Sequence, residues 1–193
     1  MSLDEYAEFI FAAGFLNDED PVKKWQVLVK EQRRLIKIIS KIKKITIKAK
    51  DTDLSLSVQN RKWISCEGKE NFPDGEVFTG PEETQVNGHV CFSFPAIYQG
   101  REVSGIRLWF ENGVVVRSSA AKNEAFLTQM LNTDEGARRL GEFAFGTNFG
   151  IQRFIKSIRT GRNDQPDFAR GAAVQKMLDA CFESDKTGKT LAV

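Results

Sequence analysis

The sequence has 193 residues, enough for one domain, or one domain with a small appendage, around an apolar core. Its 28 basic and 26 acidic residues nearly balance, so the overall charge indicates no particular partner. The three cysteines, Cys66, Cys91 and Cys181, form no C-x-x-C pair and are odd in number, which argues against a disulfide framework and favours the cytoplasm.

Two helices are predicted at the start of the chain. Aromatic spacing at positions 6, 9 and 11 indicates a short helix over residues 3–16. The apolar run at 9–16 is not a signal peptide, because acidic residues precede it, and no run in the sequence is long enough to span a membrane. Asp20 as N-cap and Pro21 in the first turn open a second helix that runs to about Lys43. Its apolar positions follow helical spacing and predict a buried stripe of Trp25, Leu28, Leu35, Ile39 and Ile42.

The second predicted helix is strongly basic. Residues 23–50 contain eleven lysines and arginines and one acid, Glu31, whereas residues 1–22 contain six acids and no base. The basic helix 23–44 allows two interpretations: an interaction or anion-binding surface, or a solvated face whose lysine stems cover apolar surface. We favour the solvated face and expect no nucleic-acid or membrane partner, because the sequence has no aromatic stacking platform and no nucleic-acid motif.

From residue 45 the apolar pattern changes to a period of two, which predicts strands. A hairpin is expected from residues 45–49 and 54–58, with Asp51-Thr52-Asp53 as its turn, and Glu111-Asn112-Gly113 marks another. Further strands are predicted at 62–67, 75–79, 89–94, 105–111, 114–118 and 141–146, and further helices at 123–131 and 171–180. We therefore expect an α+β fold with N-terminal helices, a mostly antiparallel sheet-rich region and a C-terminal helix.

Two glutamates follow glycines at the entry to apolar runs. Glu76 follows the turn Pro73-Asp74-Gly75, and Glu142 follows Gly141. Carboxylates held on rigid elements can bind a metal cation through oxygen. From spacing alone, however, a solvated residue at a strand end is the commoner explanation for each glutamate.

A series of motifs surrounds these glutamates: Thr52-Asp53-Leu54, Arg61-Lys62-Trp63, Pro73-Asp74-Gly75-Glu76-Val77-Phe78-Thr79, Val86-Asn87-Gly88, Phe94-Pro95-Ala96-Ile97-Tyr98-Gln99-Gly100-Arg101-Glu102-Val103, Ile106-Arg107-Leu108-Trp109-Phe110, Thr133-Asp134-Glu135-Gly136-Ala137-Arg138-Arg139-Leu140-Gly141-Glu142 and Gly146-Thr147-Asn148. In this order, residues 1–158 resemble the thermophilic-type metalloaminopeptidases, the aminopeptidase T and aminopeptidase S family. The resemblance implies that Glu76 and Glu142 are ligands of two divalent metal ions, zinc or cobalt or else magnesium. It implies a reaction that hydrolyses N-terminal residues from a peptide substrate, and it suggests a homodimer.

The resemblance also implies ligands that the sequence does not show: two histidines, a tyrosine and an aspartate beyond the second glutamate. The only histidine, His89, precedes Glu142 and matches no ligand position, and Tyr98 is interpreted as a core residue. The resemblance further implies an N-terminal domain that these 193 residues do not include. We therefore expect a fragment of a two-metal aminopeptidase that is inactive by itself, with no catalytic residue assigned. The alternative is a non-enzymatic interaction or anion-binding module that uses the basic helix 23–44.

Residues 159–193 depart from the family pattern. They are similar to the C-terminal end of glucose-fructose oxidoreductase and inositol dehydrogenase-like proteins, and we expect an unrelated helical tail. A gene fusion, a frameshift or an assembly chimera near residues 156–166 would each explain the junction. No G-x-G-x-x-G loop occurs in the sequence, so no NAD site is expected.

Overall fold

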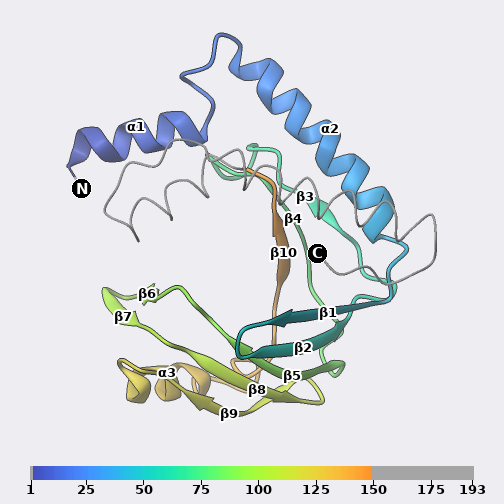
Figure 1. The fold of residues 1–193 in the computed structure, drawn as a ribbon, viewed down its shortest axis with the longest axis vertical. Coiled ribbons are helices and arrows are strands. Elements are labelled where there is room, and N and C mark those ends of the chain that lie inside the picture. Colours follow the sequence, from blue (N-terminus) through green and yellow to red (C-terminus); the bar gives the residue numbers. More distant parts are fainter. Residues whose placement is uncertain (1, 149–193) are drawn as a thin grey trace. The chain divides into compact units, whose positions relative to one another are not determined.

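The computed structural model describes residues 2–148, which contain three helices and ten strands (Figure 1). Contacts divide this part of the chain into two compact units. The first unit comprises residues 2–41, 63–78 and 144–148, and the second comprises residues 42–62 and 79–143. The helices and antiparallel sheets confirm the predicted α+β fold, whereas the C-terminal helix predicted at 171–180 lies outside the described residues. None of the described helices has the length and apolar character that crossing a bilayer demands.

The two N-terminal helices of the first unit begin where the sequence predicts. Helix α1 (Leu3–Ala13) starts at a capping box, in which Ser2 and Glu5 hydrogen-bond each other's main-chain N–H groups. Helix α2 (Pro21–Ile39) starts at Asp20, whose Oδ1 accepts from the Lys23 N–H at 2.9 Å. The prediction that α2 runs to about residue 43 was wrong: α2 ends at Ile39, a turn follows at residues 40 and 41, and the chain enters an edge strand at residue 44.

The first unit also holds a three-stranded sheet in the order β10-β4-β3. Its strands are β3 (Ile64–Ser65), β4 (Glu76–Thr79) and β10 (Phe143–Gly146), whose end residues Thr79 and Phe143 fall in the second unit. The strand predicted at 62–67 is thus much shorter. The strand predicted at 141–146 begins only at Phe143, so that Glu142 precedes the strand rather than lying in it.

The stripe predicted on α2 is confirmed at Leu35 and Ile39, which are buried, while Trp25 is half-buried. The sequence did not predict that a polar residue shares this face. Gln32 has 0% of its surface exposed and is one of the most deeply buried side chains of the described chain.

The second unit is built on a five-stranded sheet with the order β1-β2-β5-β8-β9 and antiparallel neighbours. Its strands are β1 (Lys44–Ala49), β2 (Thr52–Ser57), β5 (Val86–Cys91), β8 (Arg107–Glu111) and β9 (Val114–Ser119). The predicted hairpin turn at 51–53 is shifted, since Thr52 and Asp53 already pair with β1 and Asp51 takes the positive φ. The hairpin turn at Asn112-Gly113 is confirmed, with positive φ at both residues.

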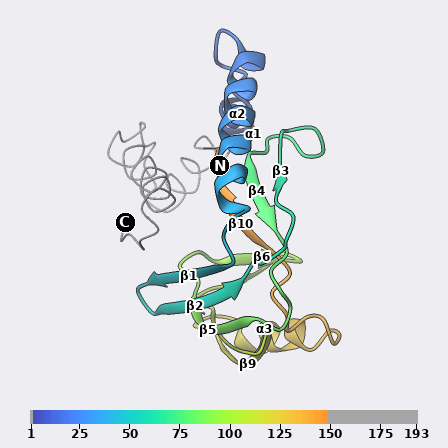
Figure 2. The ribbon, with the colours of Figure 1, turned by 90° about the vertical axis from the view of Figure 1, so that its right-hand side faces the viewer.

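A small hairpin, β6 (Ala96–Tyr98) with β7 (Arg101–Val103), was not predicted as strands. Helix α3 (Glu124–Leu131) packs against β7 and β9, and Figure 2 shows it next to β9. Val103, Ile106 and Phe126 are buried there in one cluster. The interpretation of Tyr98 as a core residue was wrong. Every residue of strand β6 is exposed, and Tyr98 is 57% exposed although its ring lies 6.5 Å from that of Phe126.

Candidate metal site around Glu76

Glu76 begins β4 directly after a tight turn, as the sequence predicts. Asp74 Oδ1 accepts from the Gly75 N–H at 2.8 Å, and Gly75 has a φ of +125°, which side chains rarely tolerate. A Cβ on Gly75 would lie 2.5 Å from the Cβ of Asn148. Only glycine therefore allows this close approach, and the turn delivers a half-buried Glu76 to the start of the strand.

Main-chain oxygens of this turn are held by the residues that follow β10. The Gly75 carbonyl accepts from the main-chain N–H groups of Thr147 and Asn148, at 2.8 and 3.0 Å, and from Thr147 Oγ1 at 2.9 Å. Asn148, which is buried, donates its Nδ2 to the carbonyls of Asp74 at 2.7 Å and Ala13 at 2.8 Å. Thr147 and Asn148, which the sequence analysis identified only as part of the motif Gly146-Thr147-Asn148, thus fix the backbone just before Glu76.

Gln32 holds the same region from the helix side. Its Nε2 lies 3.1 Å from the carbonyl oxygens of both Cys66 and Glu76 and 3.0 Å from Thr147 Oγ1, so two N–H groups serve three acceptors. Its Oε1 accepts from Ser65 Oγ at 2.7 Å. The buried amide is therefore satisfied at both ends, as burial of such a group requires.

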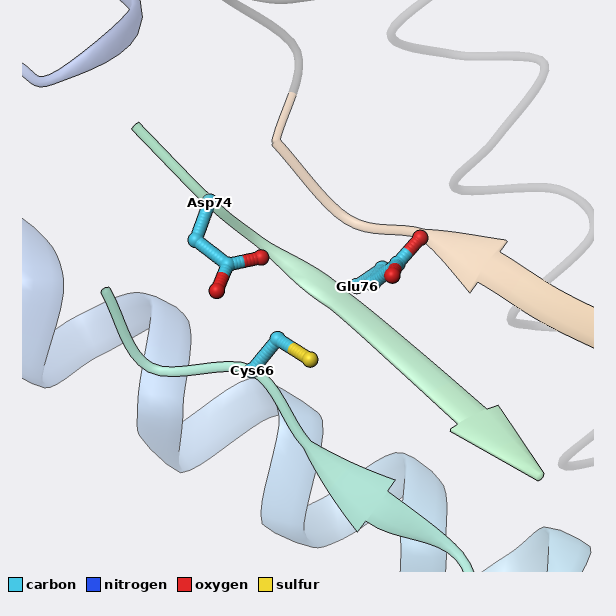
Figure 3. Close-up of side chains that lie close together, drawn as sticks. All are labelled: Cys66, Asp74 and Glu76. Atoms are coloured by element: carbon cyan, nitrogen blue, oxygen red, sulfur yellow. The ribbon is translucent and has the colours of Figure 1, made fainter. Parts of the chain in front are cut away.

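Three side chains of types that can bind a metal ion lie together at this place. The thiol of Cys66 and the carboxylates of Asp74 and Glu76 have donor atoms that all lie within 4.8 Å of one another, and all three residues are half-buried (Figure 3). Asp74 and Glu76 flank Gly75, at the point where the turn enters β4. Cys66 follows β3 and donates its N–H to the Glu76 carbonyl at 2.9 Å, which continues the register Ser65↔Val77.

The chemistry of these three donors, one thiol and two carboxylates, determines which cations they can bind. Two carboxylates provide hard oxygen ligands, and a thiolate adds a softer ligand that zinc and cobalt accept and magnesium does not favour. The residues present therefore fit a zinc- or cobalt-like divalent ion, with three side-chain donors. Cys66 was not predicted as a ligand, but the pairing of two nearby short strands would have pointed to it.

Glu142, the other predicted ligand, has a different setting. It is exposed, lies in the second unit, and belongs to no donor group among residues 2–148. His89, on β5, is half-buried and also belongs to no donor group among residues 2–148; its ring stacks on Trp109 with centroids 6.5 Å apart. Cys66 and Cys91 are thiols rather than disulfide partners.

Comparison with known proteins gives a consistent family. The sequence profile described as thermophilic metalloprotease (M29) matches residues 1–189. Aminopeptidase T from Thermus aquaticus is 33% identical over 148 residues, which cover 70% of this chain and 36% of the relative. Aminopeptidase AmpS from Bacillus subtilis is 31% identical over 151 residues, which cover 71% of this chain and 36% of the relative.

Solved structures agree with the sequence matches. Wild-type AmpT from Thermus thermophilus has a TM-score of 0.64 at 31% identity and covers 72% of this chain and 36% of its own. A 2,5-dihydroxypyridine dioxygenase from Pseudomonas putida shares the fold alone, with a TM-score of 0.51 at 14% identity over 66% of this chain and 42% of its own.

Two facts about extent follow from these matches. The chain spans about 36% of the length of the curated relatives just described. The family match also continues to residue 189, and nothing supports the expected similarity of residues 159–193 to glucose-fructose oxidoreductase or inositol dehydrogenase-like proteins.

Proposed function

The chain belongs to the thermophilic metalloprotease (M29) family, and we propose that it carries part of the metal site of an aminopeptidase that removes N-terminal residues from peptides. The observation that carries this proposal is the Glu76 carboxylate, held on a fixed backbone within 4.8 Å of the Asp74 and Cys66 donors. The names of the relatives, aminopeptidases T and AmpS, support the reaction class.

Glu76 and Glu142 are the proposed metal ligands, and Asp74 and Cys66 are further donors beside Glu76. A divalent ion, when bound, polarises the scissile carbonyl and makes a water molecule nucleophilic near neutral pH. The contribution of Cys66, Asp74 and Glu76 is to hold their donor atoms close together on a backbone that long-range hydrogen bonds fix. Zinc or cobalt fits the sulfur donor better than magnesium does.

We expect no peptidase activity from the 193-residue chain alone. Catalytic zinc sites normally take three protein ligands with imidazole among them, and the only histidine lies on β5 outside any donor group of the described residues. A homodimer, a cytoplasmic location and a domain division at residue 158 remain proposals. Sequencing genomic DNA across codons 150–200 tests the division, because a continuation of the family pattern in another frame would indicate a frameshift.

The function is tested by metal binding. Metal-free protein is titrated with Co²⁺ in a calorimeter, for the wild type, Glu76→Gln, Glu142→Gln and Glu83→Gln. Loss of a ligand should weaken binding by at least about tenfold in the first two variants, whereas the exposed control at Glu83 should bind as the wild type does. Equal affinity of Glu76→Gln and the wild type would remove the proposal. Hydrolysis of leucyl-p-nitroanilide by the chain, abolished in Glu142→Gln, would contradict the expected inactivity.

A second candidate rests on a groove of about 1130 Å³ along α2. Its lining combines the aromatic rings of Trp25 and Phe72 with the cationic side chains of Lys30, Arg33, Arg34, Lys37 and Lys69. This lining suits an anionic ligand with an apolar part. Arg33 is 3.4 Å from Glu67 and Arg34 is 3.9 Å from Glu31, and these ion pairs reduce the net positive charge of the groove.

Salt-dependent retention on heparin tests this second function. Retention that disappears when Lys30, Arg33, Arg34 and Lys37 are replaced together by glutamine would support an anion-binding role for α2. Elution of the wild-type protein at low salt would rule out an anion-binding role for α2. The basic residues would then be a solvated face of the helix.

A further inference from the structure

The turn that presents Glu76 has three consecutive carbonyl oxygens, and every one of them accepts from a partner outside the turn. Asn148 Nδ2 donates to Asp74 O, Thr147 donates through both its N–H and its hydroxyl to Gly75 O, and Gln32 Nε2 donates to Glu76 O. The partners come from α2 and from the segment after β10, far away in sequence. Carbonyls fixed in this way leave the peptide planes on either side of the Glu76 Cα little room to rotate.

Gln32 is an unusual choice for its place in the fold. It lies on the face of α2 that otherwise buries Leu35, Ile38 and Ile39, where an apolar residue would pack without any polar group to satisfy. Its amide reaches the carbonyls of Cys66 and Glu76, two of the three residues in the donor cluster. The polar contacts of Gln32 are thus directed at the residues that carry the ligand atoms.

We propose that Gln32, Thr147 and Asn148 are positioning residues that hold the Glu76 carboxylate in the orientation a divalent metal ion requires. This inference rests on the proposed function, in which Glu76 is a metal ligand. None of the three contacts the ion; each acts through the backbone of the Asp74-Gly75-Glu76 turn. Partners that orient a ligand from behind affect metal affinity on the order of tenfold or more.

Thr147 offers the cleanest substitution because its hydroxyl both accepts from Gln32 and donates to Gly75. Thr147→Val keeps the shape of the side chain and removes both hydrogen bonds, whereas Thr147→Ser keeps the hydroxyl. Titration of the metal-free 193-residue protein with Co²⁺, followed by visible absorption, should show affinity reduced on the order of tenfold for valine. Serine should bring affinity back to within about threefold of the wild type.

Thr79→Val separates positioning from general destabilisation. Thr79 lies on the same strand as Glu76, is 1% exposed, and donates its hydroxyl to the Lys62 carbonyl at 2.8 Å, so its replacement should lower the urea midpoint as Thr147→Val does. Its Co²⁺ affinity should nevertheless equal that of the wild type. Gln32→Met, which replaces the amide by an apolar chain of similar length, serves in place of Thr147→Val should that variant not fold, with the same expected loss.

The outcomes of these titrations separate the positioning role from the proposed function. Equal losses of affinity in Thr147→Val and Thr79→Val, or no loss in Thr147→Val, would overturn the positioning role. Weaker binding in Glu76→Gln together with wild-type binding in Thr147→Val would remove this inference and leave the proposed function standing. No Co²⁺ binding by the wild type, or wild-type binding by Glu76→Gln, would remove both.

Discussion

Glu76 and Glu142 each follow a glycine, and Glu76 begins β4 whereas Glu142 directly precedes β10, but the surroundings of the two glycine–glutamate steps differ. A Cβ on Gly75 would collide with Asn148, and the carbonyls around it are held from α2 and from the segment after β10. A Cβ on Gly141 would meet no atom of residues 2–148 within 4 Å, and Glu142 is exposed. The same local pattern therefore occurs once in a tightly held turn and once in an open segment.

The difference shows what makes a carboxylate rigid. The turn residues set the direction of the chain, but the contacts that fix it come from 32, 147 and 148, which are 44 to 74 positions away from the carbonyls they hold. A glycine followed by a glutamate at the entry to an apolar run occurs in both places. Only the distant hydrogen-bond partners distinguish the Gly75-Glu76 step from the Gly141-Glu142 step. We therefore expect substitutions at the Gly75 turn to lower the free energy of unfolding much more than substitutions at Gly141.

Replacing the two glycines by alanine should give the largest contrast. Gly75→Ala must adopt a φ near +125° and clash with the Asn148 Cβ, so the free energy of unfolding should fall by about 3 kcal/mol. Gly141→Ala has room and no positive φ, and should change that free energy by less than about 1 kcal/mol. Urea denaturation followed by circular dichroism measures both values. Equal effects would mean that the Gly75 turn is no more constrained than the Gly141 segment.

Removing the amide of Gln32 should have the second largest effect. Gln32→Met leaves Ser65 without its acceptor and takes a donor from three oxygen atoms in a buried place, which should lower the free energy of unfolding by about 2 kcal/mol. The matched control is Gln26→Met, since Gln26 lies on the same helix and is exposed. The control should stay within about 0.5 kcal/mol of the wild type in the same urea titration.

The outcome of the sequence-based predictions follows the same division. Patterns within one segment were enough for the start of α1, the cap of α2, the turn before Glu76 and the hairpin at Asn112-Gly113, because each depends on neighbouring residues. The buried Gln32 and the donor Cys66 were missed because their roles arise only when α2, β3 and β4 come together. Tyr98 was misplaced because an apolar motif does not reveal that the strand carrying it is exposed.

A third contrast concerns the two thiols. Cys66→Ser removes the sulfur donor beside Glu76 and should weaken Co²⁺ binding on the order of tenfold, equivalent to about 1.4 kcal/mol, with loss of the near-ultraviolet sulfur-to-cobalt absorption. Cys91→Ser changes a thiol on β5 that belongs to no donor group of the described residues, so affinity and spectrum should be unchanged. A wild-type spectrum from Cys66→Ser would show that the thiol is a neighbour of the site and not a ligand.

The smallest effect is expected from the ion pairs next to this site, and it should depend on pH. The hydrogen bond from Lys69, at 2.7 Å, and the nearby charges of Lys69 and Arg33 lower the pKa of Glu67 below its ordinary value of 4.5. Because the pKa is lower in the folded state, the pair stabilises the fold above pH 4.5, and this contribution is lost as the pH falls through the folded-state pKa. Glu67→Gln should therefore lower the free energy of unfolding by about 0.5 kcal/mol at pH 7 and by nothing measurable in acid well below pH 4.5.

Urea titrations of Glu67→Gln at both pH values measure this difference, and Glu82→Gln provides the control. Glu82 lies 3.7 Å from Arg61 in the second unit, with both side chains more than 40% exposed, and its replacement should change stability at pH 7 by less than about 0.5 kcal/mol. If Glu67→Gln cost more than Gln32→Met at pH 7, charges at the surface would hold the Glu76 region together. The structure instead assigns that role to buried, uncharged hydrogen bonds, because Lys69 and Arg33 pair with Glu67 through largely exposed side chains whose attraction water and salt screen.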